Sequence, residues 1–298
     1  MKRVLVSLIL NLYFVTLTVA GVETDLQKDN LIGPAQTVRT ETAQFSNQSG
    51  QWVEGPLEPS ASVIYDTRGN RTEVIGNVFV GKTLHIHDAQ GDLTETLDYS
   101  PDGALSEKMV YAYDNKKNLR KTVSYSPDGV SLRTTLYTYS ASGQLIEQIS
   151  CDDIGCFDRK ACTYDIQGNL IEESFYSPDG SGIKLRLVHT YNEQGRRTQT
   201  ESYDPHDAGL GIEKTVETYD ANGNSLELTT YYTEKVGDEE GKPIPPPNKW
   251  IYTYEWDAHG NWIKQTRILC TSETGSPVCE PSMVTYRTIT YYPETGGK

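Results

Sequence analysis

One short turn motif recurs along most of this chain, and its regular return restricts the fold more than any other feature. An aromatic residue precedes Asp, Asn or Ser, two variable residues, usually Gly, and a polar residue, as in Tyr65-Asp66-Thr67-Arg68-Gly69-Asn70. A repeat of roughly 22 to 28 residues is typical of proteins built by stacking one supersecondary unit. The copies begin at Tyr65, His87, Tyr113, Tyr139, Tyr164, Tyr191, Tyr219 and Trp256.

A second class of turn lies between these copies. Asp or Ser at the first position can accept a hydrogen bond from the backbone two residues on, Pro presets φ, and Gly accepts a left-handed backbone. Both classes therefore reverse the chain and predict β-hairpins. The second class comprises Ser100-Pro101-Asp102-Gly103, Ser126–Gly129, Ser177–Gly180 and the looser Asp204–Asp207.

The stretches between turns are rich in β-branched and aromatic residues, as in Met109–Tyr113 and Thr134–Tyr139. Such stretches favour strands. The Tyr that starts a repeat and the Leu or Val three residues earlier point to opposite faces, so neither face is purely polar. We expect an all-β, antiparallel β-hairpin repeat meander in a curled or spiralling sheet, with N-terminal capping strands over 21–60 and repeats over 61–298.

Charged residues also recur at fixed positions within the repeat. Cross-strand charge pairs that keep an extended sheet in solution explain them best, and a binding track is the alternative. Acids lie eight residues after the repeat start (Glu73, Glu95, Glu147, Glu172, Glu227), and bases lie five before it (Lys82, Lys108, Arg159, Arg186, Lys214).

The amino terminus has the features of a secretory signal peptide. Met1-Lys2-Arg3 is basic, residues 4–20 are almost uninterrupted apolar sequence, and Ala20 is a small residue before Gly21. We expect a signal peptide over 1–20, a mature chain that starts near Gly21 or Val22, and no membrane span after cleavage; an uncleaved anchor is the alternative. The protein is expected to be secreted, periplasmic or at the cell surface.

The charge balance argues against nucleic acid as a partner. The chain carries 27 Lys and Arg against 41 Asp and Glu, a formal charge of −14, which becomes −16 without Lys2 and Arg3. Phosphate backbones are bound by clustered cations, and here the cations are dispersed.

Five cysteines lie beyond residue 21, and two pairs flank short loops. Cys151 and Cys156 enclose four residues, and Cys270 and Cys279 enclose a longer loop, so each pair is placed for a cross-hairpin disulfide in an oxidising compartment. Cys162 remains unpaired. Zinc ligation is the alternative, although the spacings are not those of zinc knuckles.

The repeated Tyr-Asp-x-x-Gly-Asn motif, followed by an apolar residue and a second Tyr, resembles the YD repeats of the RHS family over residues 61–292. The resemblance implies a spiralling hairpin sheet and an association with carbohydrate binding or with encapsulation of another polypeptide. The chain has fewer repeats than a complete RHS shell, so we expect a short exported repeat protein. The family has no catalytic residues in its repeats.

No set of residues suggests catalysis or a cofactor. His85 and His87 lie on one strand face but lack a third metal ligand by sequence. Each Asp-x-x-Gly-Asn turn offers one carboxylate, too few for calcium. The adjacent pairs Asp152-Asp153 and Glu172-Glu173 should diverge rather than cooperate in glycoside hydrolysis. We predict no catalytic residue, no metal and no cofactor.

The Pro-rich insertion Gly237–Lys249 breaks the repeat spacing, and aromatic residues gather beside it. Exposed aromatic rows stack on sugars or anchor protein interfaces, while packing of the last repeats is the alternative. The preferred ligand site therefore comprises Trp250, Tyr252, Tyr254, Trp256 and Trp262. The leading functional hypothesis is a non-enzymatic scaffold that binds a glycan or a protein. A purely structural surface protein and a hydrolase with an unrecognised site are the alternatives.

Overall fold

The computed structural model describes residues 24–76, 81–177, 182–203, 212–232, 247–271 and 277–293. The expected signal peptide, the turn Asp204–Asp207, most of the turn Ser177–Gly180 and most of the Pro-rich insertion lie outside these residues. Within the described ranges, no helix has the length and apolar character needed to cross a membrane.

The described chain is almost entirely antiparallel strand, as expected, with one helical turn, α1 (Asp25–Lys28), at its start. The strands are β1 (Ala35–Gln48), β2 (Gln51–Glu54), β3 (Glu58–Tyr65), β4 (Arg71–Ile75), β5 (Lys82–His87), β6 (Leu93–Tyr99), β7 (Leu105–Tyr113), β8 (Leu119–Tyr125), β9 (Ser131–Tyr139), β10 (Leu145–Cys151), β11 (Cys156–Tyr164), β12 (Leu170–Tyr176), β13 (Ile183–Tyr191), β14 (Arg197–Tyr203), β15 (Ile212–Tyr219), β16 (Ser225–Tyr232), β17 (Asn248–Trp256), β18 (Trp262–Thr271) and β19 (Val278–Tyr291).

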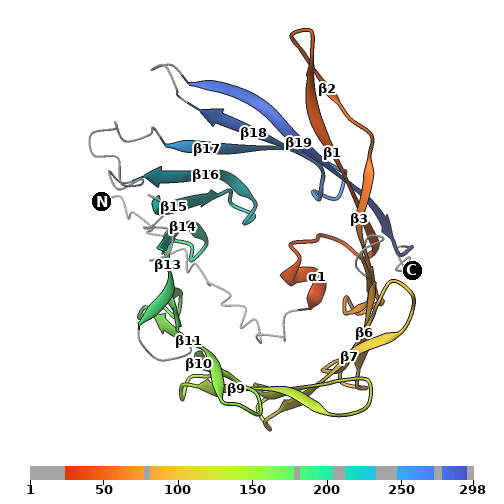
Figure 1. Ribbon diagram of the computed structural model, residues 1–298, viewed down its shortest axis with the longest axis vertical. Helices are drawn as coiled ribbons and strands as arrows, with labels where there is room; N and C mark the ends of the chain where they lie inside the picture. Colours follow the sequence, from red (N-terminus) through yellow and green to blue (C-terminus); the bar gives the residue numbers. More distant parts are fainter. Residues whose placement is uncertain are drawn as a thin grey trace, which may run out of the picture.

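The meander closes into a barrel and does not spiral. From β3 to β19 each strand pairs with the next, and β1 pairs with β3 on one side and with β19 on the other, which gives a closed wall of 18 strands. Strand β2 lies outside this ring and pairs with the end of β1. Figure 1 shows the ring, with α1 inside it. The sequence predicted the meander, and the structure adds that the meander closes into a barrel.

The predicted turns reverse the chain where expected, and all the aromatic-Asp turns lie on one rim. In the first of them the Gly69 amide donates to the Asp66 carbonyl at 3.0 Å, and the Asp66 carboxylate accepts from the Arg68 and Asn70 amides. The same bonds recur at Asp165–Asn169. We call this edge of the barrel the Asp-turn rim.

The outward side chains carry the predicted cross-strand charge pairs. The Lys108 and Arg159 side chains lie 2.8 Å from Glu95 and Glu147, respectively. Several of these cations also lie over a Tyr ring on the following strand, as Arg159 does over Tyr176 at 4.8 Å. Further pairs of this outer belt are Lys82–Glu73, Arg186–Glu172, Lys214–Glu201 and Lys249–Glu227.

The inward side chains tie successive hairpins together near the Asp-turn rim. The Tyr113, Tyr164 and Tyr191 hydroxyls donate to backbone carbonyls of the preceding hairpin, at Leu93, Leu145 and Leu170, over 2.8 to 2.9 Å. A buried tyrosine hydroxyl needs such a partner, and here the partner is a carbonyl at the start of a strand.

Residues 24–34 run across the Asp-turn rim on the inner side of the wall. Thr24 caps α1, and the Leu26 amide donates to the Gly69 carbonyl at 3.0 Å. Asp29 accepts from Tyr65 and Arg71. At the far end, the buried Asn261 side chain donates to the Ile32 carbonyl at 2.8 Å and accepts from the Ile32 amide at 2.7 Å.

The apolar core is small and lies under this N-terminal segment. It contains Leu26, Leu31, Ala35, Val38 and Tyr65. Away from it, many buried residues of the wall are Thr or Ser, such as Thr96, Thr122 and Ser150. A barrel of this strand number leaves an interior lumen rather than a packed centre. The inner side chains of the wall therefore line this lumen.

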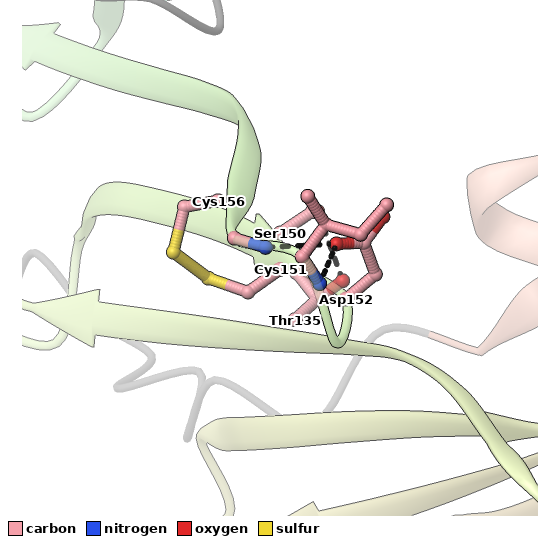
Figure 2. The surroundings of a disulfide bond; sticks show 7 residues. Thr135, Ser150, Cys151, Asp152 and Cys156 are labelled. Atoms are coloured by element: carbon pink, nitrogen blue, oxygen red, sulfur yellow. Dashed lines mark hydrogen bonds between the residues drawn. A yellow bond between two sulfur atoms is a disulfide. The ribbon is translucent and has the colours of Figure 1, made fainter.

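The two predicted disulfides are confirmed. Cys151 bonds Cys156 and Cys270 bonds Cys279, both at the rim opposite the Asp turns, while Cys162 is a buried free thiol. Figure 2 shows the first bond next to the turn in which the Asp152 carboxylate accepts from the Ile154 and Gly155 amides. The Thr135 and Ser150 hydroxyls are hydrogen-bonded at 3.0 Å beside it.

Replacing Gly168 by Val should lower the free energy of unfolding by about 1–2 kcal/mol, since Gly168 has φ +91° and a β-branched residue resists that conformation. Gly182 is the control, because no atom lies within 4 Å of a Cβ placed there and its φ is outside the left-handed region. Denaturant unfolding of Gly168→Val and Gly182→Val measures both free energies of unfolding. Equal losses of free energy in the two variants would contradict the prediction.

Joint replacement of Cys151 and Cys156 by Ser should lower the free energy of unfolding by about 2 kcal/mol, the loop-closure entropy of a short disulfide loop. Cys162→Ser should leave both disulfides intact. Non-reducing peptide mapping of the wild-type protein tests the pairing, and a peptide that joins Cys162 to another cysteine would disprove it.

Candidate functional site

An inward row of chemically distinctive side chains runs around the barrel, two residues before each repeat start. Strand alternation and the inward Tyr113 and Tyr191 place this position on the inner wall. Each member faces a residue of the following strand, as His189 faces Thr200 and Cys162 faces Glu173. The inner row comprises His85, Tyr111, Tyr137, Cys162, His189, Glu217 and Tyr254.

From β11 to β15 the inner row forms a continuous polar network centred on His189. The Lys160 ammonium lies 3.0 Å from Glu173, and the other Glu173 oxygen lies 3.3 Å from His189 Nε2. His189 Nδ1 is 2.9 Å from the Thr200 hydroxyl, which also contacts the Tyr219 hydroxyl at 3.2 Å. Tyr219 donates to Glu217 at 2.8 Å.

Burial decides the protonation of this network. Desolvation lowers the pKa of His189, whose side chain is 1% exposed, although Glu173 opposes the shift. Burial raises the pKa of Glu173, but the hydrogen bonds from Lys160 and His189 outweigh it, so its pKa is below the ordinary value. A neutral His189 therefore donates a hydrogen bond from Nε2 to the Glu173 carboxylate and accepts one at Nδ1 from the Thr200 hydroxyl.

The order carboxylate, imidazole, hydroxyl is that of an acyl-transfer triad, but the setting of Thr200 differs from that of a triad nucleophile. Thr200 lies within β14 and is paired on both sides, with His189 and with Glu217. A nucleophile in a triad sits where backbone amides can also stabilise an oxyanion, whereas the amides of a central strand serve the sheet ladder.

A cleft of about 680 Å³ opens on the Asp-turn rim above His189. Its sides are formed by residues of two neighbouring turns, within 165–169 and 192–195, and its lining also includes Ile171, His189 and Tyr191. Asp165 is held within its own turn by the Asn169 amide and side chain. Gln167, Glu193 and Gln194 line the cleft, and their side chains have no hydrogen-bond partner within the described part of the chain.

The aromatic residues predicted as the ligand site lie together on β17 and β18. The Tyr254 ring lies 5.6 Å from Trp256 and 6.0 Å from Trp262, and its hydroxyl donates to the Ser225 carbonyl. Trp256 is 41% exposed. Trp250 and Tyr252 are half-buried on the inner wall beside Arg267, and the insertion expected to border them lies mostly outside the described residues.

The histidine and carboxylate pairs considered in the sequence do not gather into one site. His87 lies 3.9 Å from Asp25 of α1, while His85 Nδ1 is buried without a partner. Over the residues that the structure describes, no three His, Cys, Asp or Glu side chains gather as a metal site. Glu172 and Glu173 diverge as predicted, since Glu172 pairs with Arg186 outside and Glu173 with Lys160 inside.

His189, Glu173 and Thr200 were not recognised as a unit in the sequence. The available indication was the alternation of each strand, because the position two residues before each repeat start carries His, Tyr, Cys or Glu in most copies. The pairing of His189 with Thr200 depends on the β13–β14 register, which a bulge at Tyr191 shifts by one residue.

A family model matches part of the chain. The flagellar basal body protein FlaE D2 domain matches residues 190–290, which is less than half of the chain and begins and ends inside β13 and β19. No curated protein matches the chain.

Several solved structures share parts of this shape. A porin-like protein from Bacteroides uniformis is 13% identical and covers 87% of this chain and 98% of its own, with a TM-score of 0.45. The TcdB2-TccC3-Cdc42 and TcdB2-TccC3-TEV structures are each 12% identical, and this chain covers 18% of either, with TM-scores of 0.30 and 0.28. Likenesses at this level assign neither a family nor an activity.

The resemblance to RHS repeats is wrong as a family assignment, because the family model that matches is a flagellar domain. The physical reason lies in the turn itself. Asp, Gly and Asn occupy fixed positions because one carboxylate must accept two amides and one residue must have positive φ. Turn chemistry alone imposes the Tyr-Asp-x-x-Gly-Asn spacing, so the spacing is a weak guide to ancestry.

His189→Gln should weaken the pH dependence of stability. Since the folded-state pKa of His189 is lowered, the unfolded chain takes up its proton first, and the free energy of unfolding falls as pH drops through about 6.5. Gln keeps hydrogen-bonding groups without titrating, so the fall between about pH 7.5 and about pH 5.5 should be smaller. Denaturant unfolding across this range measures it. An unchanged slope would show that His189 is not held neutral.

Proposed function

We propose that this chain is an exported, non-catalytic carbohydrate-binding protein whose cleft on the Asp-turn rim takes an uncharged glycan. The observation that carries the proposal is the composition of the cleft. Gln167 and Gln194 each offer an amide donor and acceptor, Glu193 offers a carboxylate, and Tyr191 and Ile171 offer apolar surface. Sugar hydroxyls both donate and accept, and their C–H faces pack on apolar groups, so this mixture fits them.

The scaffold supports a binding role. The turns that form the cleft are fixed by their own hydrogen bonds, and the wall behind them is closed, so the backbone positions of Gln167 and Gln194 are set before a ligand arrives. Such preorganisation lowers the entropic cost of binding. The cleft lining contains no Lys or Arg, which disfavours phosphate-bearing ligands.

Export is part of the proposal and rests on the cysteines and the amino terminus. Two disulfides need an oxidising compartment, and residues 1–20 have the composition of a signal peptide.

A variant with both Gln167→Ala and Gln194→Ala should bind the recognised glycan on the order of tenfold or more weakly, with unchanged melting temperature. A glycan array identifies the ligand, and calorimetry measures the loss. Asn222→Ala is the matched control, because Asn222 holds the same turn position as Gln194 outside the cleft. Loss of binding in the control alone, or an array without any ligand, would contradict the proposal.

The hydrolase alternative is favoured by one observation, the Glu173–His189–Thr200 order. Incubation with an O-acetylated form of the bound glycan separates the two functions, because a triad of this order would cleave an ester. A binding protein releases no acetate, whereas acetate release by the wild type that is lost in Thr200→Val would show catalysis.

A further inference from the structure

Two half-buried guanidinium groups on the inner wall differ from most cations of this chain. In the outer belt, Lys and Arg pair with Glu at distances such as the 2.8 Å between Arg186 and Glu172. Arg267 and Arg287 have no carboxylate within 4.0 Å in the described ranges, although the chain has a formal charge of −14. Burial lowers the pKa of Arg287, although the more distant Asp29 and Asp257 carboxylates oppose the shift.

Each of these guanidiniums is stacked on an indole ring. Arg267 Cζ lies 4.4 Å from the Trp250 centroid, and Arg287 Cζ lies 4.1 Å from the Trp262 centroid. Stacking fixes the plane of a guanidinium and leaves its N–H edge directed away from the ring. Arg267 Nε is buried without a hydrogen-bond partner in the described ranges.

The register places both groups on the inner wall. Arg267 pairs with Tyr252 on one side and Met283 on the other, and Met283 shares a strand face with Arg287. Lys264 pairs with Tyr286, so Arg287 lies level with Ile263, four residues along β18 from Arg267. At about 3.3 Å per residue the separation is roughly 13 Å. Gln265, bonded to the Tyr254 hydroxyl at 3.0 Å, lies between them.

We propose that this wall is an anionic subsite, in which Arg267 and Arg287 bind carboxylate groups of an acidic saccharide inside the barrel. This subsite lies on β18 and β19, apart from the rim cleft of β12 and β13. The proposal rests on the carbohydrate-binding function proposed above and extends it to a second, acidic saccharide. A carboxylate matches the planar N–H edge of a guanidinium, and it would neutralise a cation that has no acidic partner. Tyr252 and Trp256 beside the arginines offer ring faces to a sugar.

The test compares a trisaccharide of galacturonic acid with its uncharged galactose counterpart by calorimetry at low salt. The wild type should bind the acidic trisaccharide on the order of tenfold more tightly, as one charge-assisted hydrogen-bonded pair would give. Arg267→Gln should abolish that preference and leave the neutral trisaccharide unaffected. Lys184→Gln is the matched control, because it removes the same charge from an exposed side chain of β13. The melting temperature of each variant checks that the barrel is intact.

The outcomes separate this proposal from the proposed function. Equal affinity for both trisaccharides overturns the anionic subsite and leaves carbohydrate binding in place. An equal loss of the preference for the acidic trisaccharide in Arg267→Gln and in Lys184→Gln also overturns the proposal, because that preference would then reflect the net charge of the protein. If Arg267→Gln does not fold, Arg267→Lys keeps the charge without the planar edge and should still lose most of the preference. Binding of neither trisaccharide overturns both proposals for this sugar class.

Discussion

The pairing of β1 with both β3 and β19 is the interaction on which the rest of this structure depends. Nine β1 residues, from Ala35 to Gln44, find partners in β19, and the same strand continues the hairpin series through β3. A meander without that strand would have two open edges, which attract other chains. Closure removes them and turns one face of every hairpin toward a shared lumen. It also brings residues 24–34 onto the rim, where Leu26 and Leu31 supply the apolar core.

The two faces of the wall then serve different purposes. Outside, cations pair with acids and lie over tyrosines of neighbouring strands, and each exposed pair contributes about 0–1 kcal/mol. Inside, hydroxyl, imidazole, carboxylate and guanidinium groups are held at fixed positions by the ladder. Because so few apolar residues are fully buried, the wall is stabilised mainly by strand pairing and cross-strand contacts.

The proposed ligand surfaces use groups that the scaffold leaves open. In the rim cleft the Asp165 carboxylate accepts hydrogen bonds within its own turn, whereas the side chains of Gln167 and Gln194 make no hydrogen bond in the described part of the chain. On the inner wall Lys160 is neutralised by Glu173, whereas Arg267 lies on Trp250 without an acid. A polar group that lacks a partner within the protein can be satisfied by a ligand.

The sequence by itself determined the hairpins, both disulfides and the outer charge pairs, because turn chemistry and strand alternation act over a few residues and between adjacent strands. It also led to a wrong family, since the same turn chemistry arises without common ancestry. Only the tertiary structure decided closure, because Ala35 and Tyr291 meet only after every intervening hairpin has added its twist. It likewise decided that the Asn261 side chain bonds Ile32 and not the Asp257 carboxylate, which accepts from Asn261 only through the backbone amide. It also decided that His189 meets Glu173 and Thr200. Those contacts depend on a bulge-shifted register and on which face becomes the lumen, and neither property is local in the chain.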